Sequence, residues 1–142
     1  MGNNNLGNNG AKRIMLVEDS TLMRTVIKRI VESVDNFKVV AEAPNGKIAL
    51  DLLHEARPDL IILDLEMPVM NGLDFLRNAR LRTRAKVMVL SSVAQAGSGN
   101  ALEARKLGAS AVLGKPSGAV SMDLEEKRSH HIIQIMKSLL RF

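Results

Sequence analysis

The sequence predicts an α/β fold in which five βα units form a doubly wound parallel sheet. Two observations predict it. Short apolar runs alternate with longer amphipathic segments, and several of the runs end in acidic, hydroxyl or lysine residues. Apolar runs without polar alternation are typical of strands buried on both faces, and helices between them allow parallel crossovers. Right-handed crossovers place the carboxyl ends of all the strands along one edge of the sheet.

Five apolar runs are predicted to be the strands of this sheet. Residues 60–63, with the sequence LIIL, form the most apolar run, so we place this strand at the centre. The complete set of predicted strands is 14–17, 37–41, 60–63, 86–90 and 111–113.

Helical periodicity follows each predicted strand. Residues 21–34 carry apolar side chains at helical spacing, 46–56 ends shortly before Pro58, and 72–80 forms a third helix. A fourth helix begins near Gly97-Ser98-Gly99 and runs to Leu107, with Gly108 as its C-cap residue. The last covers about 122–140, and its run 132–136 is apolar on more than one side. This run fits deep packing on the sheet or, alternatively, a dimer or partner face.

Composition limits the class of protein. The chain has 142 residues, 46% of them hydrophobic and 25% charged, which suits one soluble domain. It has no cysteine, which excludes disulfides and thiolate metal sites, and its three histidines do not form a zinc motif. No apolar run approaches the roughly 18 residues of a membrane span, and the N-terminus does not resemble a secretory signal. We expect a flexible arm over 1–12, a folded domain over 13–142, no membrane contact and a cytoplasmic location.

Positive charge is concentrated in one part of the sequence. The net charge is +5, and the basic stretch consists of Arg77, Arg80, Arg82, Arg84 and Lys86. We interpret it as a solvated helix end and loop. The alternative is a docking patch for an acidic partner or for nucleic acid. Nucleic acid is disfavoured because the chain has three Phe and neither Tyr nor Trp to stack on bases.

Polar side chains occupy the carboxyl ends of four predicted strands. They are Glu18-Asp19, Asp64, Ser91-Ser92 and Lys115. Open α/β sheets bind ligands outside this edge. Any one of these residues alone would be read as a helix cap, a turn residue or a surface lysine. All of them at one edge instead indicate a site.

The chemistry of this set points to phosphoryl transfer. Crowded carboxylates repel each other unless a cation intervenes, and oxygen ligands suit Mg²⁺. A divalent ion would keep Asp64 ionised as a nucleophile and would neutralise charge on a transferring phosphoryl group. Lys115 supplies a positive charge for one phosphate oxygen, and Ser91 can donate a hydrogen bond to another.

These residues also carry a family resemblance. Glu18-Asp19-Ser20, the run from Asp64 to Gly72 with the sequence DLEMPVMNG, Ser91-Ser92 and Lys115-Pro116 resemble the receiver domains of bacterial two-component response regulators. The resemblance covers about Arg13 to the C-terminus. It implies a flavodoxin-like sheet with strand order 2-1-3-4-5, an order taken from the family, whose chemotaxis member is a known example.

The resemblance implies a role for each matching residue. Asp64 would be the phosphoacceptor, and Asp19 and Asp64 would bind Mg²⁺ directly. The backbone carbonyl of Glu66 would be a third ligand, and Glu18 would act through a water molecule. The implied phosphoryl contacts come from Ser91, Lys115 and the Ser92 backbone N–H, with a cis bond between Lys115 and Pro116.

The implied function is a phosphoprotein that works in two-component signalling. A histidine kinase would donate the phosphoryl group, and a downstream output protein would read the resulting change of surface. Such a domain catalyses its own phosphorylation and dephosphorylation and is not otherwise an enzyme. We expect a monomer or weak dimer.

A closer similarity links the chain to one branch of the family. Residues 63–68, 87–92 and 115–118 look like the regulatory domain of the chemotaxis receptor methylesterases, which places chemotaxis first among the pathways. Those enzymes carry a further hydrolase domain, whose Gly-x-Ser-x-Gly motif is not found here; Gly97-Ser98-Gly99 does not match it. The chain is therefore either a stand-alone receiver, which the initial Met1 favours, or an excised regulatory domain.

Two positions depart from the usual receiver pattern. Val112 stands three residues before Lys115, where many receivers have the aromatic residue that swings inward on phosphorylation. Glu66 stands two residues after Asp64, close enough to affect attack by water on a phosphoryl group, in a direction that the sequence leaves open.

Two rival classes are weighed against the receiver. A small Mg²⁺-dependent phosphatase would usually have Asp where Glu66 stands, together with a cap domain. A pseudo-receiver would have lost part of the set formed by the acidic pair, Asp64, Ser91 and Lys115, which is complete here.

Overall fold

The protein, studied as a computed structural model, alternates strands and helices along the chain. The structure describes residues 10–92, 99–116 and 122–141. Within these ranges the elements are β1 (Lys12–Val17), α2 (Thr21–Glu32), β2 (Phe37–Ala43), α3 (Gly46–Ala56), β3 (Leu60–Leu63), α4 (Gly72–Ala79), β4 (Lys86–Ser91), α5 (Gly99–Lys106), β5 (Ala111–Gly114) and α6 (Met122–Leu139).

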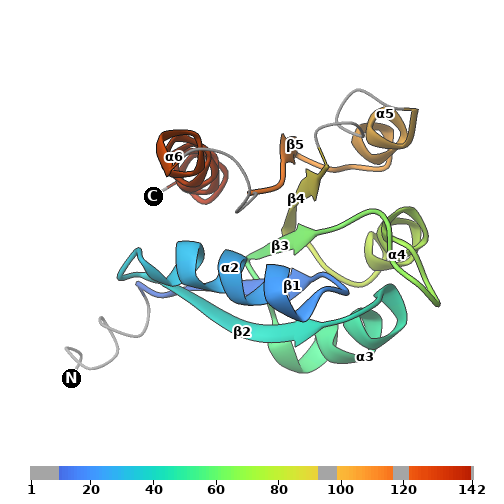
Figure 1. Ribbon diagram of the computed structural model, residues 1–142. Coiled ribbons are helices and arrows are strands. Elements are labelled where there is room, and N and C mark those ends of the chain that lie inside the picture. The colour runs from blue at the N-terminus through green and yellow to red at the C-terminus, as the bar shows by residue number, and fades with distance from the viewer. Residues whose placement is uncertain (1–9, 93–98, 117–121, 142) are drawn as a thin grey trace, which may run out of the picture.

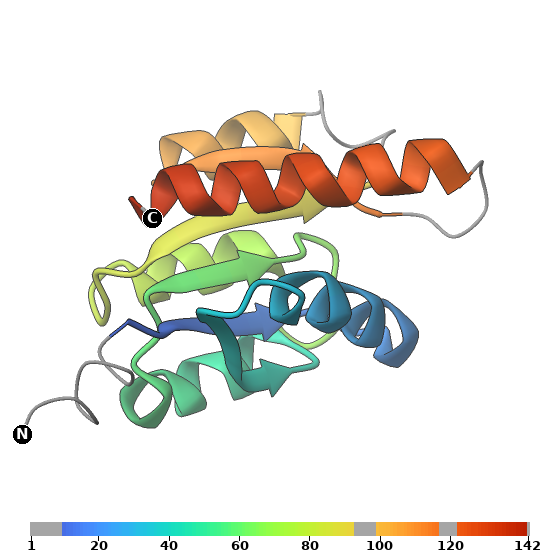
Figure 2. The same cartoon turned by 90° about the vertical axis from the view of Figure 1, so that its left-hand side faces the viewer.

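The strands form one parallel sheet with β3 at its centre. Their order is β2-β1-β3-β4-β5 (Figure 2). The register places Ile61 of β3 opposite Met15 on one side and Val87 on the other. The predicted α/β class, the central position of 60–63 and the strand order 2-1-3-4-5 are all confirmed.

Helices cover both faces of the sheet. α3, α4 and α5 lie on one face, and α2 and α6 lie on the other (Figure 1). Because successive side chains of a strand point to opposite faces, β3 sends Ile61 and Leu63 into the first layer and Leu60 and Ile62 into the second. Buried on both sides, such strands need apolar residues at every position, which explains the continuous runs in the sequence.

Polar side chains define where three of the helices begin. Ser20 Oγ accepts a hydrogen bond from the backbone N–H of Met23, and Asn45 and Asn71 cap α3 and α4 in the same way. Each cap pairs a backbone N–H that the first helical turn would leave without a partner. α2 starts shortly after the carboxyl end of β1, and Gly72 at the start of α4 lies against the backbone of Asp64 and Leu65 at the end of β3.

Some element ends differ from the prediction. β1 begins at Lys12 and β2 extends to Ala43, because backbone pairing between these strands continues through polar residues outside the apolar runs. α2 ends at Glu32, where the N–H of Ser33 bonds to the carbonyls of Arg29 and Ile30 and tightens the last turn. Gly108 has a φ of 109°, which confirms its place just after α5. Residues 1–9 of the predicted arm, and Gly97 and Ser98, lie outside the described residues.

The apolar run of α6 packs into the sheet. Ile132 and Met136 are buried against side chains of the same layer as Ile14 and Met88, and Ile135 packs beside them. This contact agrees with the first of the two predictions for this run, deep packing on the sheet. In the part of the chain that the structure describes, no helix combines the length and apolar character of a membrane span.

Candidate functional site

Glu18 and Asp19 follow β1 directly but have different environments. The Glu18 N–H donates to the carbonyl of Ala43, which continues the sheet pairing by one residue. Its side chain is buried, and its Oε2 accepts a hydrogen bond of 2.9 Å from the Ser20 N–H. Asp19 is exposed. Since Ser20 supplies the helix cap, the Asp19 carboxylate is not used for capping and remains available to a ligand.

Asp64 lies next to this pair at the end of β3. Its N–H donates to the carbonyl of Val17, and only 5% of the residue is exposed. Its Oδ1 accepts a hydrogen bond of 3.3 Å from the Glu66 N–H. One carboxylate oxygen each from Glu18, Asp19 and Asp64 lies within 4.8 Å of the others, which is a spacing that could hold a metal ion.

Lys115 reaches this cluster from β5. Its Nζ lies 2.7 Å from Glu18 Oε1 and 3.2 Å from Asp64 Oδ2. Its backbone N–H donates to the carbonyl of Ser91 at 2.8 Å, so the end of β5 is fixed to the end of β4. Ser91 is buried, and its Oγ makes a long contact of 3.5 Å with the Ser92 carbonyl. The sequence prediction that these residues meet at one edge agrees with this geometry.

Burial and charge act against each other in the cluster. Burial raises the pKa of Glu18 and Asp64, and the hydrogen bonds and charge of Lys115 offset part of this effect. Burial also lowers the pKa of Lys115, but its hydrogen bond to Glu18 and the charges of both carboxylates outweigh burial and raise it. The ammonium of Lys115 pairs with Glu18 and Asp64, and the nearby Asp19 adds a third carboxylate to the cluster, so carboxylates outnumber the ammonium.

The remaining predicted residues lie around this cluster. The side chain of Glu66 is exposed, while its N–H is turned toward Asp64. Ser92 is exposed directly after β4. Val112 is half-buried in β5 and packs against the hydrophobic layer that contains Leu63 and Val89, so it contributes to the core on that face of the sheet.

Comparisons with known proteins place this arrangement in a family. The model of the response regulator receiver domain matches residues 14–124, which is most of the chain. The chain belongs to the response regulator receiver family.

Individual relatives agree with this assignment. A protein-glutamate methylesterase/protein-glutamine glutaminase of Treponema pallidum is 44% identical over 112 residues, which are 78% of this chain and 28% of that protein. The receiver thus spans less than a third of that relative's length. Another protein of the same name, from Pyrococcus horikoshii, is 35% identical over 126 residues, which are 89% of the chain and 34% of that protein.

Solved structures give the same assignment. The response regulator domain of Thermotoga maritima CheB superposes with a TM-score of 0.81 at 30% identity, covering 93% of this chain and 98% of that one. A chain from the complex of the CheA3 P1 domain with CheY6 of R. sphaeroides gives a TM-score of 0.77 at 45% identity, covering 94% and 99%.

One expectation taken from the family resemblance was wrong. The bond between Lys115 and Pro116 is trans, and no peptide bond of the described residues is cis. The trans form of a bond before proline is favoured by about 0.5–1 kcal/mol. The ammonium of Lys115 reaches both Glu18 and Asp64 with this trans bond in place.

Two arginines support the receiver site and were missed from the sequence. Arg24 Nη1 donates to the carbonyl of Glu18 at 2.6 Å and lies 3.4 Å from that of Asp19, while its Nε pairs with Glu42 at 3.5 Å. Arg24 thereby holds the loop that carries both acidic residues. Arg24 lies six residues after Glu18 and one turn into α2, and this spacing could have indicated that its side chain reaches back to the acidic loop. Arg128 of α6 donates to the Lys115 carbonyl at 3.0 Å, and no sequence pattern indicates this contact.

The loop after Asp64 is packed closely against its surroundings. The N–H of Gly72 donates to the carbonyl of Leu65, and a Cβ at Gly72 would lie 2.4 Å from the backbone oxygen of Asp64. The N–H of Gly46, at the start of α3, donates to the carbonyl of Met70. The clash at Gly72 explains why glycine stands there, and the two hydrogen bonds fix the course of the chain that follows Asp64.

Proposed function

We propose that this receiver accepts a phosphoryl group on Asp64 and acts in chemotaxis signalling. The observation that carries the proposal is the buried Asp64 carboxylate, with two further carboxylates within 4.8 Å and the Lys115 ammonium at 3.2 Å. Burial makes Asp64 a nucleophile that water hydrates poorly, and its neighbours supply binding groups for a phosphoryl group. A histidine kinase is the proposed donor, consistent with the likeness to a chain from the R. sphaeroides complex of CheY6 with the P1 domain of CheA3.

A divalent cation fits the residues of this site. The pKa values of Glu18 and Asp64 are raised because the one ammonium does not compensate for burial and for three carboxylates. Asp19 and Asp64 would hold Mg²⁺ directly, with the Glu66 carbonyl as a further ligand and Glu18 acting through water. The ion would supply charge neutralisation for the phosphoryl oxygens.

The residues of the chain then have distinct tasks. An oxygen of Asp64 attacks phosphorus, the P–N bond of the phosphohistidine breaks, and its electron pair stays on the imidazole nitrogen, which takes a proton. Lys115 pairs with one oxygen of the transferred group, and Ser91 and the Ser92 N–H donate to others. The added charge draws Ser91 and Lys115 toward Asp64 and changes the surface that an output protein contacts.

Acetyl phosphate with Mg²⁺ provides a direct test. Intact-mass spectrometry should detect one added phosphoryl group on the wild-type chain and none on Asp64→Asn. The matched control is Asp51→Asn, which alters an exposed aspartate on α3 and should be labelled like the wild type. Lys115→Met should be labelled about a hundredfold more slowly, the usual scale for losing a group that stabilises the transition state. Equal labelling of Asp64→Asn and the wild type would exclude Asp64 as the acceptor.

The methylesterase relatives favour a second candidate function. The 44% identity to the Treponema pallidum protein suggests that the receiver regulates a methylesterase catalytic domain. The test adds the receiver, with and without acetyl phosphate, to the separately produced remainder of that protein. Release of methanol from a methylated receptor should change with phosphorylation, and an unchanged rate would contradict regulation of this kind.

A further inference from the structure

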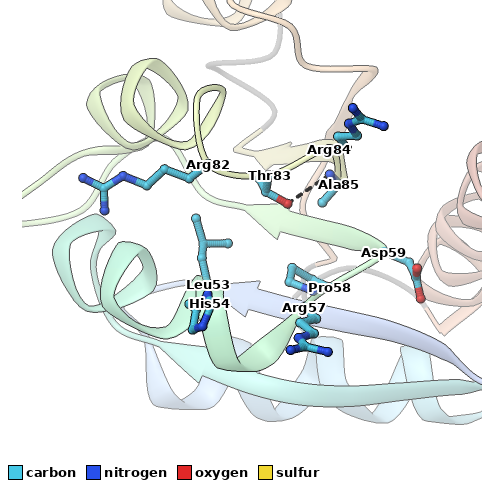
Figure 3. Close-up of a pocket in the computed structure, with 9 residues that line it drawn as sticks. All are labelled: Leu53, His54, Arg57, Pro58, Asp59, Arg82, Thr83, Arg84 and Ala85. Carbon is cyan, nitrogen blue, oxygen red and sulfur yellow. Dashed lines mark hydrogen bonds between the residues drawn. The ribbon is translucent and has the colours of Figure 1, made fainter.

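The edge of the sheet opposite to Asp64 contains a cavity lined by basic side chains. Its volume is about 410 Å³, and it lies between the end of α3 and the segment that joins α4 to β4 (Figure 3). Arginine side chains extend around it, and apolar side chains form part of its wall. The lining residues that matter here are Arg57, Arg82, Arg84, Leu53, Pro58 and Ala85.

The arginines around this cavity are not neutralised. Among the described residues, Arg57, Arg82 and Arg84 form no ion pair, whereas Arg77 pairs with Asp74 at 2.8 Å. The one carboxylate in the lining, that of Asp59, accepts a hydrogen bond of 2.8 Å from the Arg13 N–H. The cavity therefore has an excess of positive charge that the receiver itself does not use.

A second hollow continues this surface. It has a volume of about 230 Å³, shares Thr83, Arg84 and Ala85 with the first, and adds Arg80. Leu81, between Arg80 and Arg82 in the chain, is 91% exposed. We call the surface formed by Arg57, Arg80, Leu81, Arg82 and Arg84 the basic edge.

We propose that the basic edge binds an acidic segment of a partner protein, one that presents carboxylates together with an apolar side chain. Charge complementarity favours carboxylates, because one guanidinium group can bind one carboxylate through two parallel hydrogen bonds. Leu81 favours a protein over a free anion. Removing its apolar surface from water is favourable when another apolar side chain covers it, and an inorganic anion has none. Arginine is also enriched in protein interfaces. The chain offers neither Tyr nor Trp for stacking on nucleic acid bases.

The backbone around the cavity is held in place before any partner arrives. The Ala85 N–H donates to Thr83 Oγ1 at 3.1 Å, and the Lys86 N–H donates to the carbonyl of Asp59 at 3.1 Å. The first bond orders the α4–β4 segment itself, and the second fixes its end to the residue that precedes β3. Because the backbone is already ordered, binding would order side chains alone, which lowers its entropic cost.

The basic edge is separate from the phosphoacceptor site. Asp59 and Asp64 flank β3 at its two ends, and the five residue steps between them span about 16 Å in an extended strand. The proposal therefore does not depend on phosphorylation and adds a second binding surface to the receiver. Failure of phosphorylation at Asp64 would leave it unaffected.

The experiment measures binding of a fluorescein-labelled peptide of glutamate and leucine residues by fluorescence anisotropy. The test variant combines Arg82→Glu with Arg84→Glu. The control combines Lys38→Glu with Lys47→Glu, which changes the net charge equally at exposed lysines on β2 and α3. We expect the test variant to bind at least about tenfold more weakly than the control, a difference typical of losing charged pairs at an interface. Leu81→Ser should also weaken binding, without any change in charge.

Further measurements distinguish the alternatives. In the wild type, the backbone NMR signals of Arg57 and of residues 81–85 should shift on adding the peptide, and those of Asp64 should not. Circular dichroism checks that the variants are folded. Equal weakening by test and control variants, or tighter binding of duplex DNA or inorganic phosphate than of the peptide, would overturn the proposal.

Discussion

The two edges of this sheet carry opposite charges and differ in how far those charges are buried. At the carboxyl end, Glu18 and Asp64 are buried and share the ammonium of Lys115. At the amino end, the arginines of the basic edge surround open cavities and form no ion pairs within the described ranges. At the acidic edge two carboxylates are buried and paired with Lys115, and only Asp19 is exposed, whereas the basic edge presents all its charges to solvent.

This difference suits the acidic edge to chemical reaction and the basic edge to binding a partner. A buried carboxylate interacts strongly with its neighbours because the surrounding dielectric is low, so small changes in charge alter its reactivity. Exposed guanidinium groups are screened by water and salt, and they become energetically important only when a partner excludes the solvent. The same contrast predicts how substitutions at each edge will affect the fold.

The largest effect is expected at the tightly packed acidic edge. Gly72→Ala would place a Cβ 2.4 Å from the backbone carbonyl oxygen of Asp64 and 2.7 Å from Leu65 Cα, so the backbone must shift. We expect unfolding to become easier by about 1–3 kcal/mol, the cost of overpacking. Urea denaturation measures this. The control is Gly99→Ala, where a Cβ meets nothing within 4 Å; loss of stability equal to that of Gly72→Ala would contradict the packing argument.

A smaller effect is expected from pH. Because the pKa values of Glu18 and Asp64 are raised in the folded state, the folded protein binds more protons than the unfolded chain between the ordinary and the raised values. Metal-free stability should therefore fall as pH rises through this interval, by at most about 1.4 kcal/mol per pH unit for each group. The raised pKa of Lys115 acts in the same direction, but only at alkaline pH.

Urea titrations across the acidic range test this dependence. Asp64→Asn should flatten the slope, and Mg²⁺ should reduce it because a bound cation favours the ionised carboxylates. A metal-free protein whose stability increases with pH through the same interval would show that the cluster is better compensated than its geometry indicates.

The smallest effect is expected at the basic edge. Arg82→Ala and Arg84→Ala remove exposed, unpaired charges, so each should change the free energy of unfolding by less than about 0.5 kcal/mol. Thermal unfolding monitored by circular dichroism is sufficient to detect a larger change. A loss above 1 kcal/mol would mean that these side chains stabilise the fold, and the proposed contrast between the edges would fail.

The sequence was most informative where chemistry and periodicity coincide. Apolar runs such as 60–63 indicated buried strands, and the polar residues directly after them indicated one shared edge. The cluster of Glu18, Asp64 and Lys115 follows from strand parity and topology, so it was within reach of the sequence. The strand order needed the family resemblance, because periodicity does not specify which strands are neighbours.

Other features depend on three-dimensional contacts that leave little trace in sequence. Asn36 and Ala43 accept backbone bonds that lengthen the pairing of β1 and β2, although polar residues interrupt the apolar pattern there. The hydrogen bond from Arg128 joins α6 to the end of β5, and no sequence motif indicates it. The basic stretch was visible in sequence, but the contribution of Arg57 to the same cavity was not, because it comes from a different helix end.

Hydrogen bonds from the N–H of Gly46 to the carbonyl of Met70 and from the N–H of Gly72 to the carbonyl of Leu65 hold one side of the acidic site. They tie the chain beyond Asp64 to α3 and to itself, which stiffens that flank of Asp64. On the other flank, Lys115 meets the acidic cluster through a long, unbranched side chain, and its carbonyl accepts a hydrogen bond from Arg128 of α6, so a shift of Lys115 would be passed on to that helix. A charge added at Asp64 should thus be felt as displacement along β5 and α6, and a protein that senses the phosphorylated form would gain most by touching that flank.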